Sequence, residues 1–363
     1  MIAPFSVGGS EVGMGIGHAY WRQSAMITAA IMVALSVLAA QQAPAQPVPA
    51  QQAPAQQEST QEAASAVMPT VTGPFQPTPI LAKRADKANP GLAPEGANDF
   101  ACRPGDRSPV LLVHGTDASA YSDFASLAPR LRLEGYCVFA LNYGVGEPGL
   151  DLSPTSGHDV PTYGTADIRS SAAEVADAVQ RIQRATGAST VDLVGFSQGA
   201  NVARYYTNKL GGARHVDAWI GIATPTYGNG AFSTITAIPG APELLAEALA
   251  PALVQQIEGS DFLRELNSPV DTVAGVSYTT INTRHDEVIQ PLQNAALRGP
   301  GARGIILQDL CPLDMSGHFQ LLYNLTVHDL VLGALDPRHE PSAACQMMAP
   351  GVGLVETFVA SNS

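Results

Sequence analysis

Short apolar runs of four to six residues recur along the chain after residue 109 and alternate with longer amphipathic segments. Apolar runs of this length, without an alternating polar face, are typical of strands that are buried on both faces of a parallel sheet. We therefore predict strands over Val110–Val113, Cys137–Leu141, Val191–Val194, Ala218–Ile222 and Val276–Ile281.

The clearest helical pattern lies between two of these runs, over Asp167–Ala185. Its apolar residues repeat at steps of four and three and so form one stripe, while charged residues occupy the other faces. The stripe consists of Ile168, Ala172, Val175, Val179 and Ile182. Gly187 is expected to end the helix. Strands that alternate with helices predict an α/β fold, with a mostly parallel central sheet flanked by helices.

The first hundred residues lack this alternation and contain a different kind of apolar run. The run Ala25–Ala40 follows Arg22, precedes small residues and is too short to span a bilayer comfortably. These features, in this order, are typical of a signal peptide. We therefore predict a signal peptide over residues 1–40, with the mature chain starting between about Ala40 and Gln46. The alternative is an uncleaved membrane anchor.

Low-complexity sequence follows the apolar run. Residues 41 to about 76 are dominated by Pro, Gln and Ala and show no apolar periodicity. Such a segment buries too little apolar surface to offset the loss of chain entropy on folding. We therefore expect residues 41–97 to form a disordered linker and residues 98–363 to form one folded domain.

Composition and charge narrow the classes of function. The net charge is −13 and no run of Lys and Arg occurs, so nucleic acid is not expected as a partner. The four cysteines, Cys102, Cys137, Cys311 and Cys345, lack the spacing of metal ligands, so we expect no metal site. An even number of cysteines in an exported chain favours two disulfides, and four buried thiols are the alternative.

The sharpest chemical signal is Gly-Phe-Ser-Gln-Gly at residues 195–199. It follows a predicted strand and leads into a helical pattern over Ala200–Leu210. In this context a Gly-x-Ser-x-Gly motif forms a tight turn that exposes the serine oxygen at the N-terminal end of a helix. Ser197 is therefore the predicted nucleophile.

A second loop is suited to stabilise the negative charge that develops during attack by the serine. The predicted strand Val110–Val113 runs directly into His114, Gly115 and Thr116. A loop at this position supplies one backbone N–H of an oxyanion hole, and the residue after the nucleophile supplies the other. We assign these donors to the amides of Thr116 and Gln198, and we interpret His114 as a structural residue.

A serine nucleophile needs a base, and the base needs an orienting carboxylate; in α/β hydrolases the order along the chain is serine, acid, histidine. Asp286 is the preferred acid because it follows a predicted strand, where ligands bind in open α/β sheets. Glu287 and then Asp309 are the alternatives. His318 is the preferred base because it lies in a glycine-flanked loop before an apolar helical pattern. His328 and His339 are less suited.

Taken together, these motifs closely resemble the secreted lipase class 2 family of triacylglycerol lipases, over about Asp99 to Cys345. The match includes Asp-Phe-Ala-Cys-Arg-Pro at 99–104, Val-His-Gly-Thr at 113–116, Gly-Tyr-Cys-Val-Phe-Ala-Leu-Asn-Tyr-Gly at 135–144, Val-Asp-Leu-Val-Gly-Phe-Ser-Gln-Gly at 191–199, Thr-Arg-His-Asp-Glu-Val at 283–288, Leu-Gln-Asp-Leu-Cys-Pro-Leu-Asp at 307–314 and Ala-Leu-Asp-Pro at 334–337.

This resemblance implies an α/β-hydrolase fold and the hydrolysis of acyl esters without a cofactor. It also implies a catalytic triad of Ser197, Asp286 and His318, and disulfides that pair Cys102 with Cys137 and Cys311 with Cys345. The sequence departs from the family in two ways. Phe196 replaces the usual polar residue before the nucleophile, and the segment 231–267 lacks the extra cysteine pair that many members carry.

The expected function is therefore that of a secreted, monomeric lipase or esterase that acts on acyl-ester or lipid substrates and contacts a lipid interface. We expect residues 231–267 to form a helical lid over the site, although an ordinary helix packed on the core is the alternative. Two other functions use the same residues or fold. One is an acyltransferase or a cutinase-like polyesterase, and the other is a catalytically silent binding protein.

Overall fold

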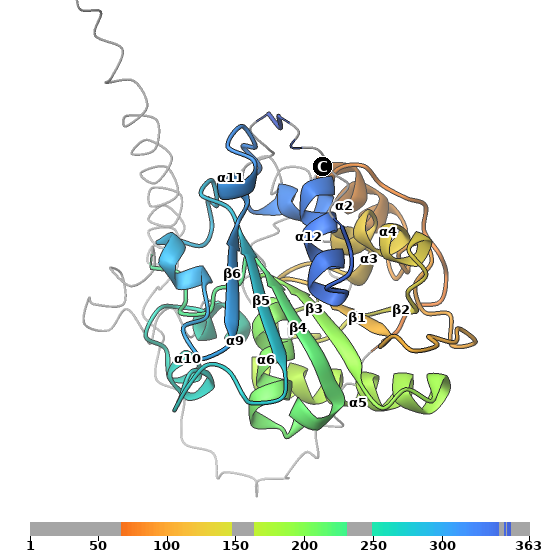
Figure 1. Ribbon diagram of the computed structural model, residues 1–363, viewed down its shortest axis with the longest axis horizontal. Coiled ribbons are helices and arrows are strands. Elements are labelled where there is room, and N and C mark those ends of the chain that lie inside the picture. Colours follow the sequence, from red (N-terminus) through yellow and green to blue (C-terminus); the bar gives the residue numbers. More distant parts are fainter. Residues whose placement is uncertain (1–66, 147–162, 231–248, 341–344, 346, 350–363) are drawn as a thin grey trace, which may run out of the picture. The chain divides into compact units, whose positions relative to one another are not determined.

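The computed structural model describes residues 67–146, 163–230, 249–340, 345 and 347–349. All of them lie in the second of two units into which the chain divides, Glu62–Ser363. This unit contains a six-stranded sheet in the order β2-β1-β3-β4-β5-β6, with helices on both faces (Figure 1). Every neighbouring pair of strands is parallel, as the apolar runs predict. The chain thus has the predicted α/β-hydrolase fold.

The described elements have the following bounds. The strands are β1 (Val110–Val113), β2 (Val138–Leu141), β3 (Val191–Phe196), β4 (Val216–Ile222), β5 (Ser277–Asn282) and β6 (Ala302–Ile306). The α-helices are α2 (Pro79–Ala88), α3 (Ala120–Phe124), α4 (Leu127–Leu133), α5 (Ile168–Thr186), α6 (Gln198–Lys209), α9 (Pro251–Gln255), α10 (Asp261–Leu266), α11 (Leu307–Leu310) and α12 (Leu325–Leu335). The 3-10 helices are η1 (Gly212–His215), η2 (Leu292–Ala295) and η3 (Phe319–Tyr323).

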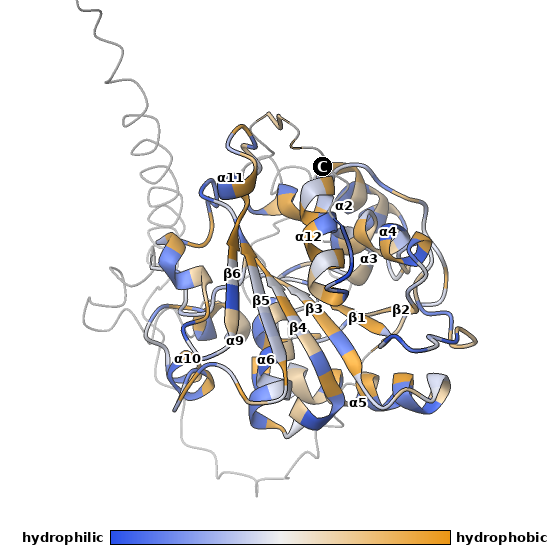
Figure 2. Cartoon of the chain, in the orientation of Figure 1, coloured by the Kyte–Doolittle hydropathy of each residue, from blue (hydrophilic) through white to orange (hydrophobic). Residues whose placement is uncertain are grey.

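Side chains of alternate strand residues divide the core into two layers. Leu112 of β1 packs with α2, α3, α4 and α12 on one face of the sheet. Leu111, the preceding residue, packs with α5, α6, α9 and α10 on the other face. The two groups of helices are seen on either side of the sheet in Figure 1, and in Figure 2 the helices carry both hydrophilic and hydrophobic residues. Strands β1, β2 and β3 are therefore buried on both faces along their whole length, as expected for a parallel sheet.

Helix α5 confirms the predicted helical pattern and its ends. The Asp167 side chain caps its start by accepting a hydrogen bond from the Arg169 N–H at 2.7 Å. Gly187 ends the helix with a φ of 76°, a left-handed conformation that glycine adopts without steric cost. The buried residues of the helix include all five members of the predicted apolar stripe.

The expected linker is wrong for its second half, because residues 67–97 belong to the folded unit. They form helix α2 and short strand-like bridges, including Thr72 to Ala93. Thr78 caps α2, and Ala82 is completely buried in the core beneath it. The sequence did not reveal helix α2, because only two residues of the helix, Pro79 and Ala82, are buried. Two buried positions are too few to produce an apolar stripe. The predicted signal peptide, residues 1–40, lies outside the described residues.

The order of the strands determines where a site can form. The chain moves from β1 to β2 in one direction and then returns across β1 to β3, so the order reverses between β1 and β3. Ligands in open α/β sheets bind beyond the carboxyl ends of the strands at such a switch point. Val113, at the end of β1, is paired with Gly195 near the end of β3. The predicted oxyanion loop and the predicted nucleophile therefore leave the sheet from adjacent strands.

The described second part of the predicted lid segment packs on the core. Helices α9 and α10 occupy residues 251–255 and 261–266, and their side chains Ala252, Phe262, Leu263 and Leu266 are buried against α5 and α6. This part corresponds to the alternative of an ordinary helix packed on the core. Residues 231–248, the first part of the segment, lie outside the described residues.

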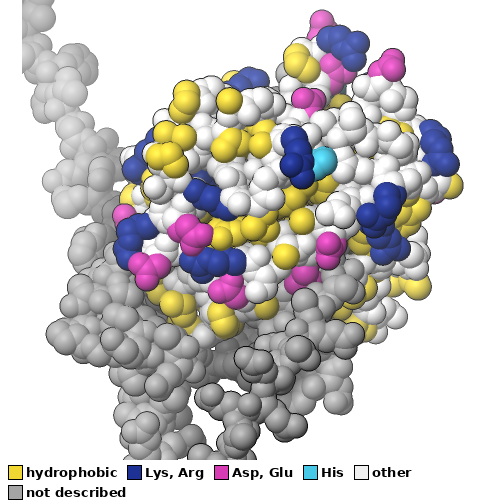
Figure 3. Space-filling model, turned by 90° about the horizontal axis from the view of Figure 1, so that it is seen from below, with side chains coloured by type: hydrophobic (Ala, Val, Ile, Leu, Met, Phe, Trp, Pro, Cys, Tyr) yellow, Lys and Arg dark blue, Asp and Glu magenta, His cyan; other side chains and the backbone are white. Residues whose placement is uncertain are grey.

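The surface is mixed in charge where Figure 3 views it from below. On that face Lys and Arg side chains are interspersed with Asp and Glu side chains, and apolar side chains lie between them. Within the described ranges, no helix is both long and apolar enough to cross a membrane.

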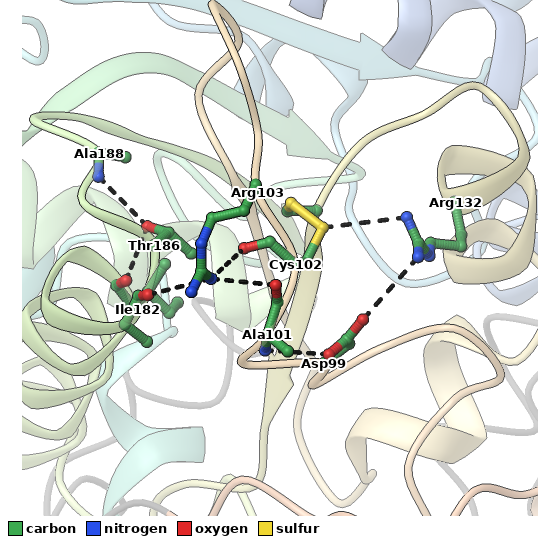
Figure 4. Close-up of a disulfide and its surroundings, with 10 residues drawn as sticks. Asp99, Ala101, Cys102, Arg103, Arg132, Ile182, Thr186 and Ala188 are labelled. Carbon is green, nitrogen blue, oxygen red and sulfur yellow. Dashed lines mark hydrogen bonds and ion pairs between the residues drawn. A yellow bond between two sulfur atoms is a disulfide. The ribbon is translucent and has the colours of Figure 1, made fainter.

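The structure contains two disulfides, Cys102–Cys137 and Cys311–Cys345, which are the pairs that the resemblance implies. Cys137 directly precedes β2 and is buried, so the first disulfide ties the start of the domain to an edge strand. Figure 4 shows its surroundings, where Arg132 lies 3.9 Å from the Cys102 sulfur.

Loss of either disulfide should destabilise the fold. The paired cysteines are separated by 35 and 34 residues, and loops of this length are worth about 3–4 kcal/mol in the chain-entropy account. We expect the double variant Cys102→Ser/Cys137→Ser to lower the free energy of unfolding by this amount in a urea titration. The wild-type protein treated with a reductant is the control and should lose the contribution of both pairs. An unchanged transition midpoint would contradict this prediction.

Candidate active site

The turn that carries Ser197 requires glycine on both sides. Ser197 has a φ of 51°, in the left-handed region that non-glycine residues rarely adopt. A methyl group on Gly195 would overlap the backbone of Ala200, and one on Gly199 would overlap the carbonyl oxygens of Val113 and His114. The Gly-x-Ser-x-Gly pattern is therefore a steric requirement of this turn between β3 and α6.

The loop after β1 lies against the first turn of α6. The Thr116 hydroxyl donates a hydrogen bond to the Gln198 side-chain oxygen at 2.7 Å. The Asp123 carboxylate accepts the Gly115 N–H at 2.8 Å and so fixes the loop from the side of α3. The structure thus brings together the two residues whose amides were predicted to form an oxyanion hole.

His114 is a structural residue, as its position before the loop suggested. Its ring is completely buried and stacks on Tyr143, with 4.3 Å between the ring centroids. The ring Nδ1 donates to the Gly115 carbonyl at 2.8 Å, and Nε2 accepts the Tyr143 N–H at 3.4 Å. Burial lowers the pKa of His114 to about 3, which favours the neutral ring that these two hydrogen bonds require.

The candidate base and its candidate orienting acid are in direct contact. The Nδ1 of His318 lies 2.9 Å from one carboxylate oxygen of Asp286, and both side chains are almost completely buried. The other oxygen of Asp286 accepts the N–H groups of Val288 and Ile289 at 2.8 and 2.7 Å. The carboxylate is therefore fixed on one side by backbone donors and directed toward the imidazole on the other.

The ring of His318 also lies beside the serine turn. It packs against the ring of Phe196, the residue before the nucleophile, with 4.9 Å between the centroids. The loop that carries His318 is held near the acid by Thr283, whose hydroxyl donates to the Ser316 carbonyl at 2.8 Å. Phe196, a departure from the resembled family, thus supplies an apolar contact for the imidazole.

The two alternative acids have other partners. Glu287 accepts the backbone N–H of His318 at 2.8 Å, and its carboxylate fills the space beside Gly317. Asp309 forms an ion pair with Arg284 at the surface. Glu287 therefore supports the histidine through its backbone, a role that the sequence did not indicate.

The other two histidines that follow Asp286 lie elsewhere. His328 is buried within α12, where its Nε2 lies 2.8 Å from the Leu322 carbonyl. His339 lies 3.4 Å from Asp329. The apolar pattern after His318 is also divided, because Asn324 ends η3 and caps α12.

The charges around His318 favour its protonated form. Burial lowers the pKa of the imidazole, but the negative charges of Asp286, Glu287 and Asp123 and the hydrogen bond to Asp286 outweigh burial, so the pKa lies above its usual 6.5. A histidine acts as a base only when it is neutral. Activity that depends on His318 should therefore fall as the pH drops through a value above 6.5.

This dependence predicts the effect of removing one of the charges. The variant Glu287→Gln keeps an oxygen that can accept the His318 N–H but removes a negative charge that raises the pKa of the imidazole. We expect the acidic limb of the pH profile of kcat/KM to move to lower pH. Asp309→Asn is the matched control, since Asp309 pairs with Arg284 at the surface, and it should leave the limb in place. A limb that does not move in Glu287→Gln would contradict the assignment.

Two supporting residues, Asp123 and Glu287, could not be recognised as such from the sequence. Each uses a carboxylate to accept a backbone N–H of a neighbouring loop: Asp123 that of Gly115, eight residues earlier, and Glu287 that of His318, 31 residues later. Neither belongs to a motif that specifies this contact, although Glu287 adjoins the preferred acid. Within the described part of the chain, no group of His, Cys, Asp or Glu is arranged to hold a metal ion.

Comparisons with known proteins agree with this architecture. The sequence matches the family model described as "Alpha/beta hydrolase family" over residues 110–361. This family is broader than the secreted lipase class 2 family that the motifs resemble. No curated protein matches the sequence.

Solved structures give a similar result. The chain is similar to Aspergillus fumigatus lipase B, with 23% identity and a TM-score of 0.54, over 74% of this chain and 63% of that one. It thus spans less than two thirds of the length of that lipase. It is also similar to Bacillus licheniformis lipase BlEst2 in mature form (15% identity, TM-score 0.45, 68% of this chain and 96% of that one). A further similar structure is carboxylesterase CesB from Bacillus subtilis (17% identity, TM-score 0.38, 65% of this chain and 86% of that one). At 23% identity the likeness to Aspergillus fumigatus lipase B concerns the fold alone.

Proposed function

The chain belongs to the alpha/beta hydrolase family, and from this premise we propose that it is a secreted carboxylic-ester hydrolase of the lipase type. Ser197 is the nucleophile, His318 the base, and Asp286 the acid that orients the base. The observation that carries the proposal is the contact of 2.9 Å between His318 Nδ1 and Asp286 beside the strained turn of Ser197. A buried carboxylate–imidazole contact and a non-glycine residue with a positive φ both cost free energy. Such features are concentrated at functional sites, which supports a catalytic role for this one.

The proposed reaction follows from the positions of these groups. With Asp286 holding the proton on Nδ1, the Nε2 of His318 has a free electron pair for the serine proton. The oxygen of Ser197 attacks the ester carbonyl carbon while His318 accepts that proton, and the amides of Thr116 and Gln198 stabilise the oxyanion. His318 then returns the proton to the leaving alcohol. Water, deprotonated by His318, attacks the acyl-enzyme, the bond to the Ser197 oxygen breaks, and His318 returns the proton to that oxygen as the carboxylic acid leaves. These residues supply all the groups for the reaction, so the proposal includes no cofactor.

The surroundings of the site favour an apolar acyl group over a charged substrate. Phe196 and Phe319 both contact the ring of His318, and the ring centroids of Phe319 and His318 are 5.1 Å apart. Export is supported by the two disulfides, because such bonds persist in oxidising compartments.

Hydrolysis of p-nitrophenyl esters of increasing acyl length tests this function. We expect release of p-nitrophenol and of the free acid for at least one chain length, and the length of maximal kcat/KM will define the acyl preference. Absence of turnover for every length from acetate to palmitate would contradict the proposal. Transfer of the acyl group to an added alcohol, without release of free acid, would instead identify an acyltransferase.

A further inference from the structure

We propose that Gln256 is a positioning residue for the oxyanion hole, because it ties both oxyanion-hole residues to helix α9. This inference deepens the proposed function and rests on it. Gln256 follows the last residue of α9 and is almost completely buried. Its side-chain nitrogen lies 2.6 Å from the Gln198 side-chain oxygen, 3.1 Å from the Thr116 hydroxyl oxygen and 3.0 Å from the Ala252 carbonyl.

These contacts complete the hydrogen bonding of a buried amide. The Gln198 side chain is fully buried, and its oxygen accepts from both Gln256 and the Thr116 hydroxyl. Its nitrogen donates to the Gly164 carbonyl at 2.8 Å and lies 3.5 Å from the Tyr143 hydroxyl. An amide with partners for both its oxygen and its nitrogen has one orientation. The Gln198 and Thr116 side chains therefore link the first turn of α6 to the loop after β1. Gln256 links both of them to a third element, helix α9.

Helix α9 is itself held in place by contacts with helix α5. Gln255, the preceding residue, accepts the Ile168 N–H at 2.7 Å and donates to the Asp167 carboxylate at 2.5 Å. Both partners lie at the start of α5, a helix of 19 residues that is packed on the sheet. The carbonyl of Gln256 also accepts the Asn229 N–H at 3.0 Å. Helix α9 thus serves as a support for the oxyanion hole, with one glutamine facing the site and its neighbour facing α5.

The consequence for catalysis is specific. Oxyanion donors act on a charge that exists only in the transition state, and their effect depends on geometry to within a fraction of an ångström. A misplacement of about 1 Å costs about 10²-fold in rate. Loss of Gln256 removes one of the two donors to the Gln198 side-chain oxygen and frees the Thr116 loop from α9. The effect should therefore appear in kcat and leave KM nearly unchanged.

A matched pair of variants tests this proposal. Gln256→Met and Gln255→Met remove the same group from adjacent residues at the same end of α9. We expect Gln256→Met to lower kcat about 10- to 100-fold with KM within about twofold. Gln255→Met should lower the melting temperature and lower kcat much less than Gln256→Met does, because its partners lie at the start of α5 and not in the oxyanion hole. Equal losses of kcat in both variants, or an unchanged kcat in Gln256→Met, would contradict the proposal.

Two further measurements keep the test decisive. If Gln256→Met does not fold, Gln256→Glu keeps the length and polarity of the side chain but places an acceptor against the Gln198 oxygen, and it should show the same loss of kcat. Thr116→Val removes the other donor to that oxygen while keeping its backbone amide. The loss in Thr116→Val/Gln256→Met should differ from the product of the two single losses, because the side chains share one partner. If the loss of kcat in the double variant equals the product of the two single losses, Thr116 and Gln256 do not act through the same Gln198 oxygen, and the proposal is contradicted. Absence of turnover in the wild-type protein would instead contradict the proposed function.

Discussion

Replacement of Ser197 by alanine should lower kcat for ester hydrolysis by at least about 10⁴-fold, because it removes the atom that forms the acyl-enzyme. The fold should persist, since alanine is smaller than serine and the close backbone approaches at Gly195 and Gly199 are unchanged. The melting temperature of the variant should therefore stay within a few degrees of the wild-type value.

The matched control for this variant is Ser189→Ala. Ser189 is exposed and lies just before β3, the strand that leads into the turn of Ser197. Its replacement should leave kcat unchanged, measured on the same p-nitrophenyl ester. A Ser197→Ala variant that keeps more than about a tenth of wild-type kcat would show that another group attacks the substrate.

Replacement of Asp286 by asparagine should lower kcat by about 10⁴-fold, and for a different reason. An asparagine can still accept the N–H groups of Val288 and Ile289 with its oxygen, so the loop should keep its shape. Its nitrogen would then face the Nδ1 of His318 as a donor. This arrangement favours the tautomer with the proton on Nε2, which cannot accept the proton of Ser197.

The surface variant Asp309→Asn serves again as the control, because Asp309 is the alternative acid that pairs with Arg284. It should keep kcat within about twofold. The steady-state rates of both variants, measured with one ester at one pH, decide between the two acids. A larger loss in Asp309→Asn than in Asp286→Asn would overturn the assignment of Asp286.

Much of the sheet was predictable, because its strands are buried on both faces and so carry continuous apolar sequence. The range predicted for the first strand, Val110–Val113, matches β1 residue by residue. The strand that was missed, β6, lies at the edge of the sheet. Its residues Arg303 and Gly304 are exposed, so an apolar run is neither needed nor present. The other edge strand, β2, is buried along its whole length and was predicted from its apolar run, so exposure, not position at the edge, hid β6.

The main residues of the site were predictable where local geometry restricts the choice of residue. The turn at Ser197 admits only glycine at two positions, and this restriction leaves a readable motif. The supporting residues Asp123, Glu287 and Gln256 are different, because no local turn or motif fixes their contacts, and those of Glu287 and Gln256 are to groups far away in the sequence. Carboxylates and amides of this kind occur throughout any soluble chain, so their roles are defined only once the fold places them.

Reaction of the protein with a fluorophosphonate, followed by peptide mapping, tests the central claim most directly. Such a reagent forms a covalent bond only with a serine whose oxygen is activated and whose oxyanion hole is in place. We predict one equivalent of adduct on the peptide that contains Ser197, and none in Ser197→Ala. Adduct on a different serine, or no adduct on folded wild-type protein, would contradict the proposal that Ser197 is the nucleophile of a serine hydrolase.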